Sequence, residues 1–220
     1  MFVNEVKSNY VIFRQDPSTA FEQLTWDDHI RKIMKKISPV IGVLKRIRWF
    51  VPASVLYSVY YSYIHSHICY LNSIWNSAPR YLLDELLLLQ KKALRNMHGL
   101  RFGTSVRQYF SGSILPIDYL CMYQTALLVY SIKNDLLKHY IPTVVNSEIH
   151  SHFTRGSSLL HTTFPRSHFG QLAITNRGFC LFNGLPLVIQ NIKNLATFKA
   201  QLKAHLFFLF RSNNDYHVLW

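Results

Sequence analysis

Residues 80–99 read RYLLDELLLLQKKALRNMHG, and this stretch decides the predicted fold. Its apolar residues recur every three or four positions, which is the spacing of one face of an α-helix. The predicted buried face consists of Leu82, Leu83, Leu86, Leu89, Leu94 and Met97. Pro79 precedes the pattern and Gly99 follows it, and these residue types commonly start and end helices. Because a helix with one apolar face needs partners, the stretch predicts a bundle of helices.

A basic helix is predicted upstream of this stretch. Thr25 and Asp28 form a Thr-x-x-Asp capping box, which satisfies the first free N–H groups of a helix. The apolar stripe of this helix consists of Ile30, Ile33 and Ile37. Ser38-Pro39 is expected to break it, because proline removes a helical hydrogen bond, and a short helix is expected to continue to Phe50.

A long apolar helix is predicted from Pro52 to about Asn76. Residues 51–79 contain no Asp, Glu, Lys or Arg, so their length and composition would suit a membrane span. Histidines, asparagines and six serines interrupt the run, however, and hydrocarbon offers such groups no partner. A buried helix outside the membrane is therefore favoured.

The second half of the chain is predicted to hold two further long helices. The first runs from Asp118 to about His139, and the last covers residues 198–210. Residues 140–160 are expected to form a loop, and residues 159–182 a short β-like pattern. In the stretch RGFCLFNGLPLVI (177–189), Gly178 is expected to allow a tight bend and Pro186 to restart helix.

The expected fold class is therefore mainly α. It comprises a thumb-like helical bundle (residues 25–110) and a helical C-terminal region with a small β-hairpin element and a final helix (residues 111–220). Aromatic and apolar residues, 15% and 49% of the 220, suffice for a core.

The charge of the chain favours an anionic partner. It contains 24 Lys and Arg against 11 Asp and Glu, for a formal net charge of +13. Such an excess is typical of nucleic-acid binders and less often of membrane-surface proteins, and an ordinary basic protein remains an alternative. Three dispersed cysteines and the absence of a secretory pattern predict an intracellular location, nuclear or cytoplasmic, rather than secretion.

The cations are concentrated in two acid-free segments. Between Asp28 and Asp84 there is no acid, and the predicted phosphate-binding residues there are Arg31, Lys32, Lys35, Lys36, Lys45, Arg46 and Arg48. A second series includes Lys91, Lys92 and Arg95 and continues to Arg101 and Arg107. Like charges four residues apart on a helix repel one another, and an external polyanion would remove that cost. An ordinary solvated helix face is the alternative.

Motifs for chemistry are weak. The acidic doublets Asp27-Asp28 and Asp84-Glu85 lie in predicted helices, where adjacent side chains diverge, so neither predicts a two-metal site. His65 and Cys69 share a helix face, but no second ligand pair at a defined spacing supports zinc. No Gly-rich phosphate loop and no nucleophile motif is present. We therefore predict no catalytic residue, no metal and no cofactor.

Several ordered motifs resemble the C-terminal part of reverse transcriptases of non-LTR (LINE-type) retrotransposons, in the jockey-like style. VNEVKSNYVIF is similar to a late palm segment, LN-x-x-KT-x-x-(I/M)-F, with Lys7 in the lysine position. LTWDDHIRKIMKKISPVIGVLKRIRWFVP is similar to LTW-x-x-HI … KI-x-x-x-IG-x-L-x-x-x-R-x-x-(L/V)P. LQKKALRNM resembles LQK-(R/K)-A-(I/L)-R, and residues 178–186 resemble G-x-x-x-(W/F)-N-x-LP.

The resemblance implies a thumb that grips the backbone of a template–primer duplex, so RNA or an RNA/DNA hybrid is the expected partner. Residues 1–24 would be a truncated palm remnant, and the aromatic-x-Asp-Asp catalytic strand would lie before Met1. The chain departs from the family in Ser8, in Phe182 and in the missing FLG turn before Leu24. It is therefore expected to bind nucleic acid without polymerising alone.

The alternative is a non-catalytic helical scaffold or protein-interaction remnant. Its partners would be proteins that dock on an apolar surface left by the missing palm, and no membrane partner is expected. The apolar side chains expected on that surface are Leu87, Leu88, Phe207 and Phe208.

Overall fold

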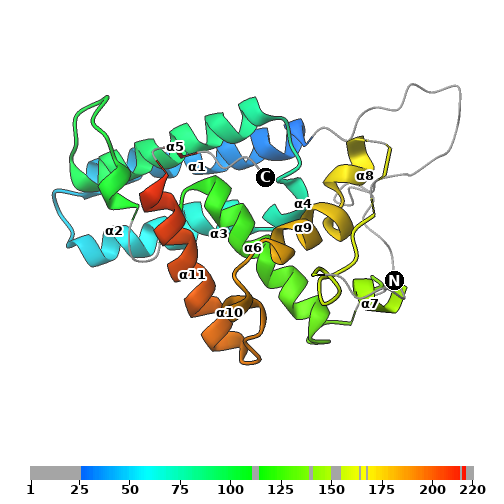
Figure 1. The fold of residues 1–220 in the computed structure, drawn as a ribbon. Coiled ribbons are helices and arrows are strands. Elements are labelled where there is room, and N and C mark those ends of the chain that lie inside the picture. The colour runs from blue at the N-terminus through cyan, green and yellow to red at the C-terminus, as the bar shows by residue number, and fades with distance from the viewer. Residues whose placement is uncertain are drawn as a thin grey trace, which may run out of the picture.

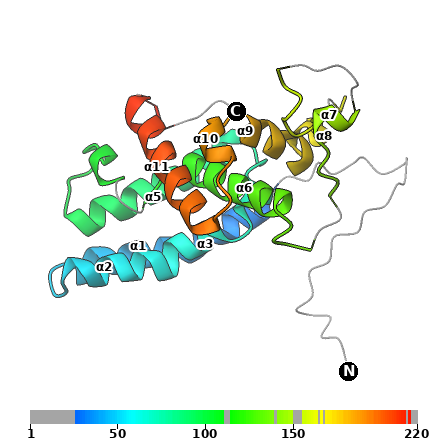
Figure 2. The ribbon, with the colours of Figure 1, turned by 60° about the horizontal axis from the view of Figure 1, so that its bottom comes forward.

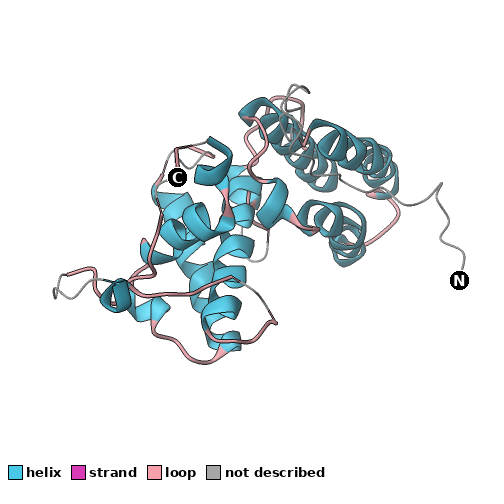
Figure 3. Ribbon diagram, turned by 90° about the vertical axis from the view of Figure 1, so that its right-hand side faces the viewer, coloured by secondary structure: helices cyan, strands magenta, loops and turns pink. Residues whose placement is uncertain are grey.

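A computed structural model describes residues 26–110, 114–138, 141–149, 155–163, 165–166, 168–213 and 215–216. Helices and connecting loops make up this part of the chain (Figure 3). The predicted palm remnant with Lys7, and Thr25 of the predicted capping box, lie outside the described residues. The mainly α fold class is confirmed.

Helix α1 (Asp27–Ile47) is the longest of the described helices and runs unbroken through Pro39. Its buried stripe consists of Ile30, Ile33, Ile37, Ile41 and Leu44. The predicted break at Ser38-Pro39 is therefore wrong. Pro39 lies on the exposed side of the helix, so its ring and the carbonyl of Lys35 that lacks its usual donor face water. Packing of the buried stripe offsets the cost of the lost hydrogen bond.

Helix α5 (Arg80–His98) runs parallel to α1, and the two lie side by side (Figure 1). Near their starts, Tyr81 Oη donates to the Asp27 carboxylate at 2.9 Å. Near their ends, Asn96 Nδ2 donates to the Ile41 carbonyl at 2.9 Å. Gly99 ends α5 with a left-handed φ of 66°, which confirms the predicted C-cap.

The buried face of α5 extends further than predicted. It consists of Leu82, Leu83, Leu86, Leu87, Gln90, Ala93, Leu94 and Met97. Leu87 is 2% exposed, so its predicted place on an apolar surface is wrong, whereas Leu88 and Phe208 are exposed as predicted. Leu89 and Phe207 are half-buried against the core. The helices packed on both sides of α5 account for this wider buried face.

A helix that returns antiparallel to α5 packs against both α1 and α5 (Figure 2). It comprises α2 (Ala53–Val59), the π-helical segment η1 (Tyr60–His65) and α3 (Ser66–Cys69). The predicted single helix to Asn76 is interrupted at Leu71, whose φ is 51°, before α4 (Asn72–Trp75). The interruption lets the buried Trp75 donate its indole N–H to the Tyr70 carbonyl at 2.7 Å.

Helix α6 (Ile117–Lys133) is the centre of the second half, and it is buried on almost all sides. It ends at Lys133, earlier than the predicted end near His139, and Asp135 beyond it takes a left-handed φ of 52°. Helices α4, α9 and α11 pack on α6 (Figure 1). The buried Asn76 Nδ2 donates to Thr125 Oγ1 at 3.1 Å, so both halves of the chain share one core.

The predicted β element is reduced to one isolated antiparallel bridge between Val145 and Leu160 within the described residues. Most of residues 159–182 is helical instead. This segment and the loop before it contain α7 (Asn146–Ile149), α8 (His168–Leu172), η3 (Ile174–Gly178) and α9 (Phe179–Asn183). Helical spacing places Phe179 and Phe182 together in the core, and this burial outweighs the local β-like pattern.

Gly178 serves close packing rather than a bend. Its φ is −66°, an ordinary helical value. A Cβ at this position would lie 3.1 Å from Val129 Cγ2 of α6 and 2.9 Å from Ile174 Cδ1. The predicted bend at Gly178 is therefore wrong, and the glycine lets η3 approach α6.

Two further helices follow α9. Pro186 precedes the short α10 (Leu187–Gln190), as predicted for a helix restart. Helix α11 (Leu195–Ser212) follows, and Asn194 caps it by accepting from the N–H groups of Ala196 and Thr197. The buried residues of α11 are Phe198, Leu202, Leu206 and Phe210.

Candidate nucleic-acid interface

The exposed side of α1 carries six cations, which we call the basic face. They are Arg31, Lys32, Lys35, Lys36, Lys45 and Arg46, and all six are exposed. Successive helical residues are about 100° apart, which places Lys35 and Arg46 opposite the buried isoleucines and Lys45 at the edge of the exposed side. The apolar residues and the charged residues of α1 both recur with the helical period, so each set stays on its own side of the helix.

Few internal partners neutralise the basic face. Arg31 Nη2 lies 3.5 Å from Asp27 Oδ1, and both side chains are partly solvated. Within the part of the chain that the structure describes, none of the other five cations forms an ion pair. The basic face therefore keeps most of its charge for solvent or for an external anion.

A shallow depression of about 410 Å³ lies on the basic face. It is lined by Arg31, Met34, Lys35, Ser38 and Pro39. The short side chains of Ser38 and Pro39 form part of the depression, and the cations Arg31 and Lys35 line it as well. Such a surface can approach a phosphate backbone closely.

Arg48 does not belong to the basic face. It is half-buried, and its guanidinium carbon lies 4.4 Å from the centre of the Trp49 ring. A Cβ on Gly99 would lie 3.1 Å from Arg48 Nη1, so the guanidinium rests against the end of α5. Arg48 therefore ties the α1–α2 turn to α5.

The three cations predicted to bind phosphate on α5 have different environments in the structure. Lys92 is exposed, but Lys91 Nζ lies 3.5 Å from the centre of the Tyr216 ring, and burial, followed by the charge of Arg95, lowers its pKa. Arg95 Nε donates to the Thr104 carbonyl at 2.9 Å and holds the loop after α5. Of these three residues, the structure leaves Lys92 the most available to a ligand.

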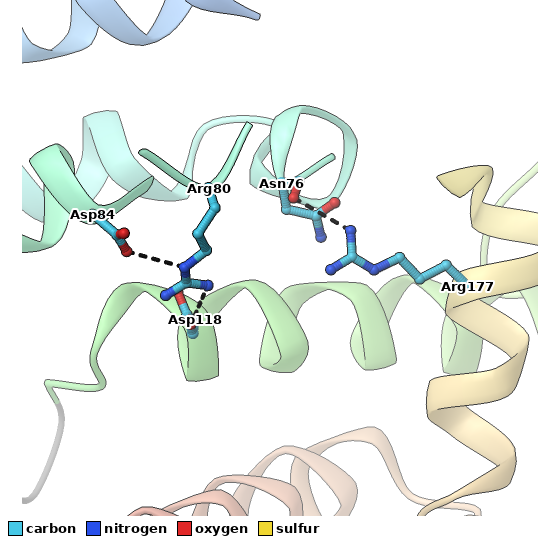
Figure 4. Close-up of polar contacts among 5 residues, drawn as sticks. All are labelled: Asn76, Arg80, Asp84, Asp118 and Arg177. Atoms are coloured by element: carbon cyan, nitrogen blue, oxygen red, sulfur yellow. Dashed lines mark hydrogen bonds and ion pairs between the residues drawn. The ribbon is translucent and has the colours of Figure 1, made fainter. Parts of the chain in front are cut away.

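A cluster of charged side chains lies between α5 and α6 (Figure 4), and we call it the buried cluster because it is centred on the buried Asp118; the Arg80 and Asp84 side chains are 44% and 43% exposed. Arg80 Nη1 lies 2.7 Å from Asp118 Oδ2, and Arg80 Nε donates to Asp84 Oδ1 at 3.0 Å. Burial opposes the charge on Arg80, but hydrogen bonding and charge from Asp118, then Asp84, raise its pKa overall. Asp118 is 3% exposed, so this carboxylate depends on partners within the fold.

Arg177 approaches the same cluster from η3 (Figure 4). Its Nη1 donates to the Asn76 carbonyl at 3.4 Å, and burial lowers its pKa. Sequence reasoning did not find the buried cluster. Its one signal is the opposite charge of Arg80 and Asp84 four residues apart, which does not reveal that Asp118 joins them.

The His65–Cys69 pair is a local contact. Cys69 Sγ lies 3.3 Å from His65 Nε2. Burial raises the pKa of the Cys69 thiol to about 11, although a hydrogen bond from Gln124 and the charge of Lys203 oppose the shift. Burial therefore disfavours the thiolate, so zinc could bind this thiol only by displacing its proton. Among the described residues, no group of three or more His, Cys, Asp or Glu side chains converges.

Comparisons with known proteins do not identify a family for the chain. No protein-family model, no curated protein and no solved structure matches the chain. None of the described helices is both long and apolar enough to cross a membrane.

Proposed function

We propose that the basic face of α1 binds the sugar–phosphate backbone of a nucleic-acid duplex, RNA or an RNA/DNA hybrid. The proposed role is that of the thumb of a non-LTR retrotransposon reverse transcriptase, to which the motifs of this chain are similar. It is a binding role and includes no bond-making step.

One observation carries this proposal: six exposed cations lie on the solvent-facing half of α1, and Asp27 is their one ion-pair partner within the described chain. A duplex carries about one negative charge per 1.7 Å, so it can neutralise several lysines at once. At about 1.5 Å per residue, the basic face from Arg31 to Arg46 spans roughly 22 Å along the helix. This length is sufficient to contact successive phosphates of one strand.

The residue types also indicate what is recognised. Lysines on flexible stems act as point charges toward phosphate oxygens. Such contacts position a duplex but carry no sequence information. The proposal therefore predicts similar affinity for duplexes of different sequence and a strong dependence on salt.

Binding of a labelled RNA/DNA hybrid, measured by fluorescence anisotropy at increasing salt, tests the proposal. In the variant Lys32→Gln/Lys35→Gln/Lys36→Gln, the negative slope of log affinity against log salt should become shallower by about 2–3, because each lost phosphate contact removes about 0.9. The matched control, Lys138→Gln/Lys193→Gln/Lys199→Gln, removes the same charge from exposed positions in the second half of the chain. Its slope should change by less than about 1.

Three results would overturn the proposal. The first is no binding at about 50 mM salt, and the second is binding that salt does not weaken. The third is an equal loss in the two triple variants, which would mean that total charge rather than the basic face determines affinity.

A further inference from the structure

One end of the helical bundle presents three large aromatic side chains to water. Trp49 and Phe50, in the turn between α1 and α2, are 74% and 86% exposed. Phe102, in the loop after α5, is fully exposed. Because α1 and α5 run parallel, this turn and this loop lie at the same end of the molecule (Figure 1).

The Trp49 side chain contacts a neighbouring cation although it is largely exposed. Arg48 stacks on its ring at 4.4 Å and rests in turn against Gly99. The Phe50 N–H donates to the Ile47 carbonyl at 2.9 Å, which closes the turn. A ring whose motion such a contact restricts loses less entropy when a flat partner stacks on it.

Exposed cations adjoin these rings along the chain. Lys45 and Arg46 are exposed within one helical turn before Trp49, and Arg101 is exposed beside Phe102. The sequence has no acid between Asp28 and Asp84, and none between Glu85 and Asp118. A ligand that matches this end must therefore offer flat apolar faces together with negative charge.

Unpaired nucleotides have this chemistry, since each base has a π-face and each linkage a phosphate. We infer that the end of the bundle formed by Lys45, Arg46, Trp49 and Phe50 binds the single strand that continues from the duplex on α1. The inference rests on the proposed function. Lys45 and Arg46 connect the two surfaces, because they belong to the basic face and adjoin the aromatic turn.

A pair of matched substrates tests this inference. One is a blunt RNA/DNA hybrid, and the other is the same hybrid with a short single-stranded overhang. The overhang should tighten binding to the intact chain about tenfold, a usual effect of stacking one base on an aromatic ring. Trp49→Ala should remove most of this gain and leave affinity for the blunt hybrid unchanged, whereas Trp49→Phe should keep much of it.

The matched control is Phe208→Ala against Phe50→Ala. Both remove an exposed phenylalanine, but Phe208 lies on α11, which packs on α6 and not at the α1–α2 turn. Phe50→Ala should reduce the gain from the overhang, and Phe208→Ala should leave it. Circular dichroism of each variant confirms that the fold is retained.

Failure of this inference is distinguishable from failure of the proposed function. Binding of the blunt hybrid without any gain from the overhang would overturn the inference alone. Loss of blunt binding together with Trp49-dependent binding of a single strand would overturn the duplex role of α1 and support stacking. Trp49-dependent binding to phosphatidylserine vesicles, without a gain from the overhang, would assign the turn to a lipid surface and overturn the inference.

Discussion

The basic face of α1 and the buried cluster around Arg80 use the same residue types in opposite ways. Each contains an arginine and an aspartate four residues apart, Asp27–Arg31 in α1 and Arg80–Asp84 in α5. Arg80 also forms an ion pair with the buried Asp118, whereas the third partner of the α1 pair is the exposed Tyr81, whose hydroxyl donates to Asp27. The comparison shows that spacing alone does not reveal whether a cation stabilises the fold or is available to a ligand.

The largest expected effect distinguishes these two arginines. Arg80→Met leaves the buried Asp118 carboxylate without its ion pair, so the free energy of unfolding should fall by about 2–3 kcal/mol, allowing for the partial exposure of Arg80. Arg31→Met loses a solvated pair and should change it by less than about 0.5 kcal/mol. Urea denaturation measures both. Equal losses would mean that the buried cluster is no more important for stability than the surface pair.

The next comparison is between two glycines, Gly178 next to Arg177 in η3 and Gly42 in α1. Gly178→Ala places a methyl group against Val129 and Ile174, so stability should fall by about 1–2 kcal/mol. Gly42 lies on the exposed side of α1, where an added Cβ would meet no atom within 4 Å, so Gly42→Ala should raise stability by about 0.5–1 kcal/mol. Thermal unfolding should therefore shift in opposite directions. A stabilising Gly178→Ala would argue against close packing of η3 on α6.

Acid should weaken the fold through histidines that are held neutral. Burial, followed by the charges of Lys32 and Lys36, lowers the pKa of His29. Burial also lowers the pKa of His98. Because the unfolded chain then binds protons more readily, stability should fall as the pH drops through the ordinary histidine pKa, and the fall should end only at the lowered pKa of the folded state. Lys32→Gln/Lys36→Gln should raise the pKa of His29, measured by NMR titration, and should leave that of His98 unchanged.

The smallest effect concerns the repulsion within the basic face. Lys32→Gln/Lys35→Gln/Lys36→Gln removes like charges from one helix, so stability at low salt should rise by a few tenths of a kcal/mol. Added salt should shrink the difference because it screens exposed charges. A clear loss of stability in this variant would show that these lysines contribute to the fold.

Long periodic segments were predictable from the sequence, and long-range partners were not. The stripes of α1 and α5 and the cap at Gly99 follow from local spacing. The continuity of α1 through Pro39 depends on packing along the whole helix, which no local signal contains. In the same way, the helical state of Phe179 and Phe182 depends on contacts with the core, although the local residues favour strand.

The candidate site was predictable to a similar degree. Spacing indicated the exposed cations of α1, because charge and apolar residues share one period. It did not indicate that Arg48 stacks on Trp49, that Lys91 lies over Tyr216 or that Arg95 holds the Thr104 carbonyl. Lys91 and Arg95 differ from their neighbours through residues that lie outside α5, and Arg48 through the adjacent Trp49 and the distant Gly99.

The parallel alignment of α1 and α5 adds an electrostatic asymmetry. Two parallel helix macrodipoles add rather than cancel, so their negative ends meet at one end of the bundle. Lys45 and Arg46 lie in the last turn of α1, and Arg95 in the last turn of α5, where positive charge offsets this field. Cations at the carbonyl ends therefore have a second role that Lys32 and Lys36, in the first half of α1, do not share.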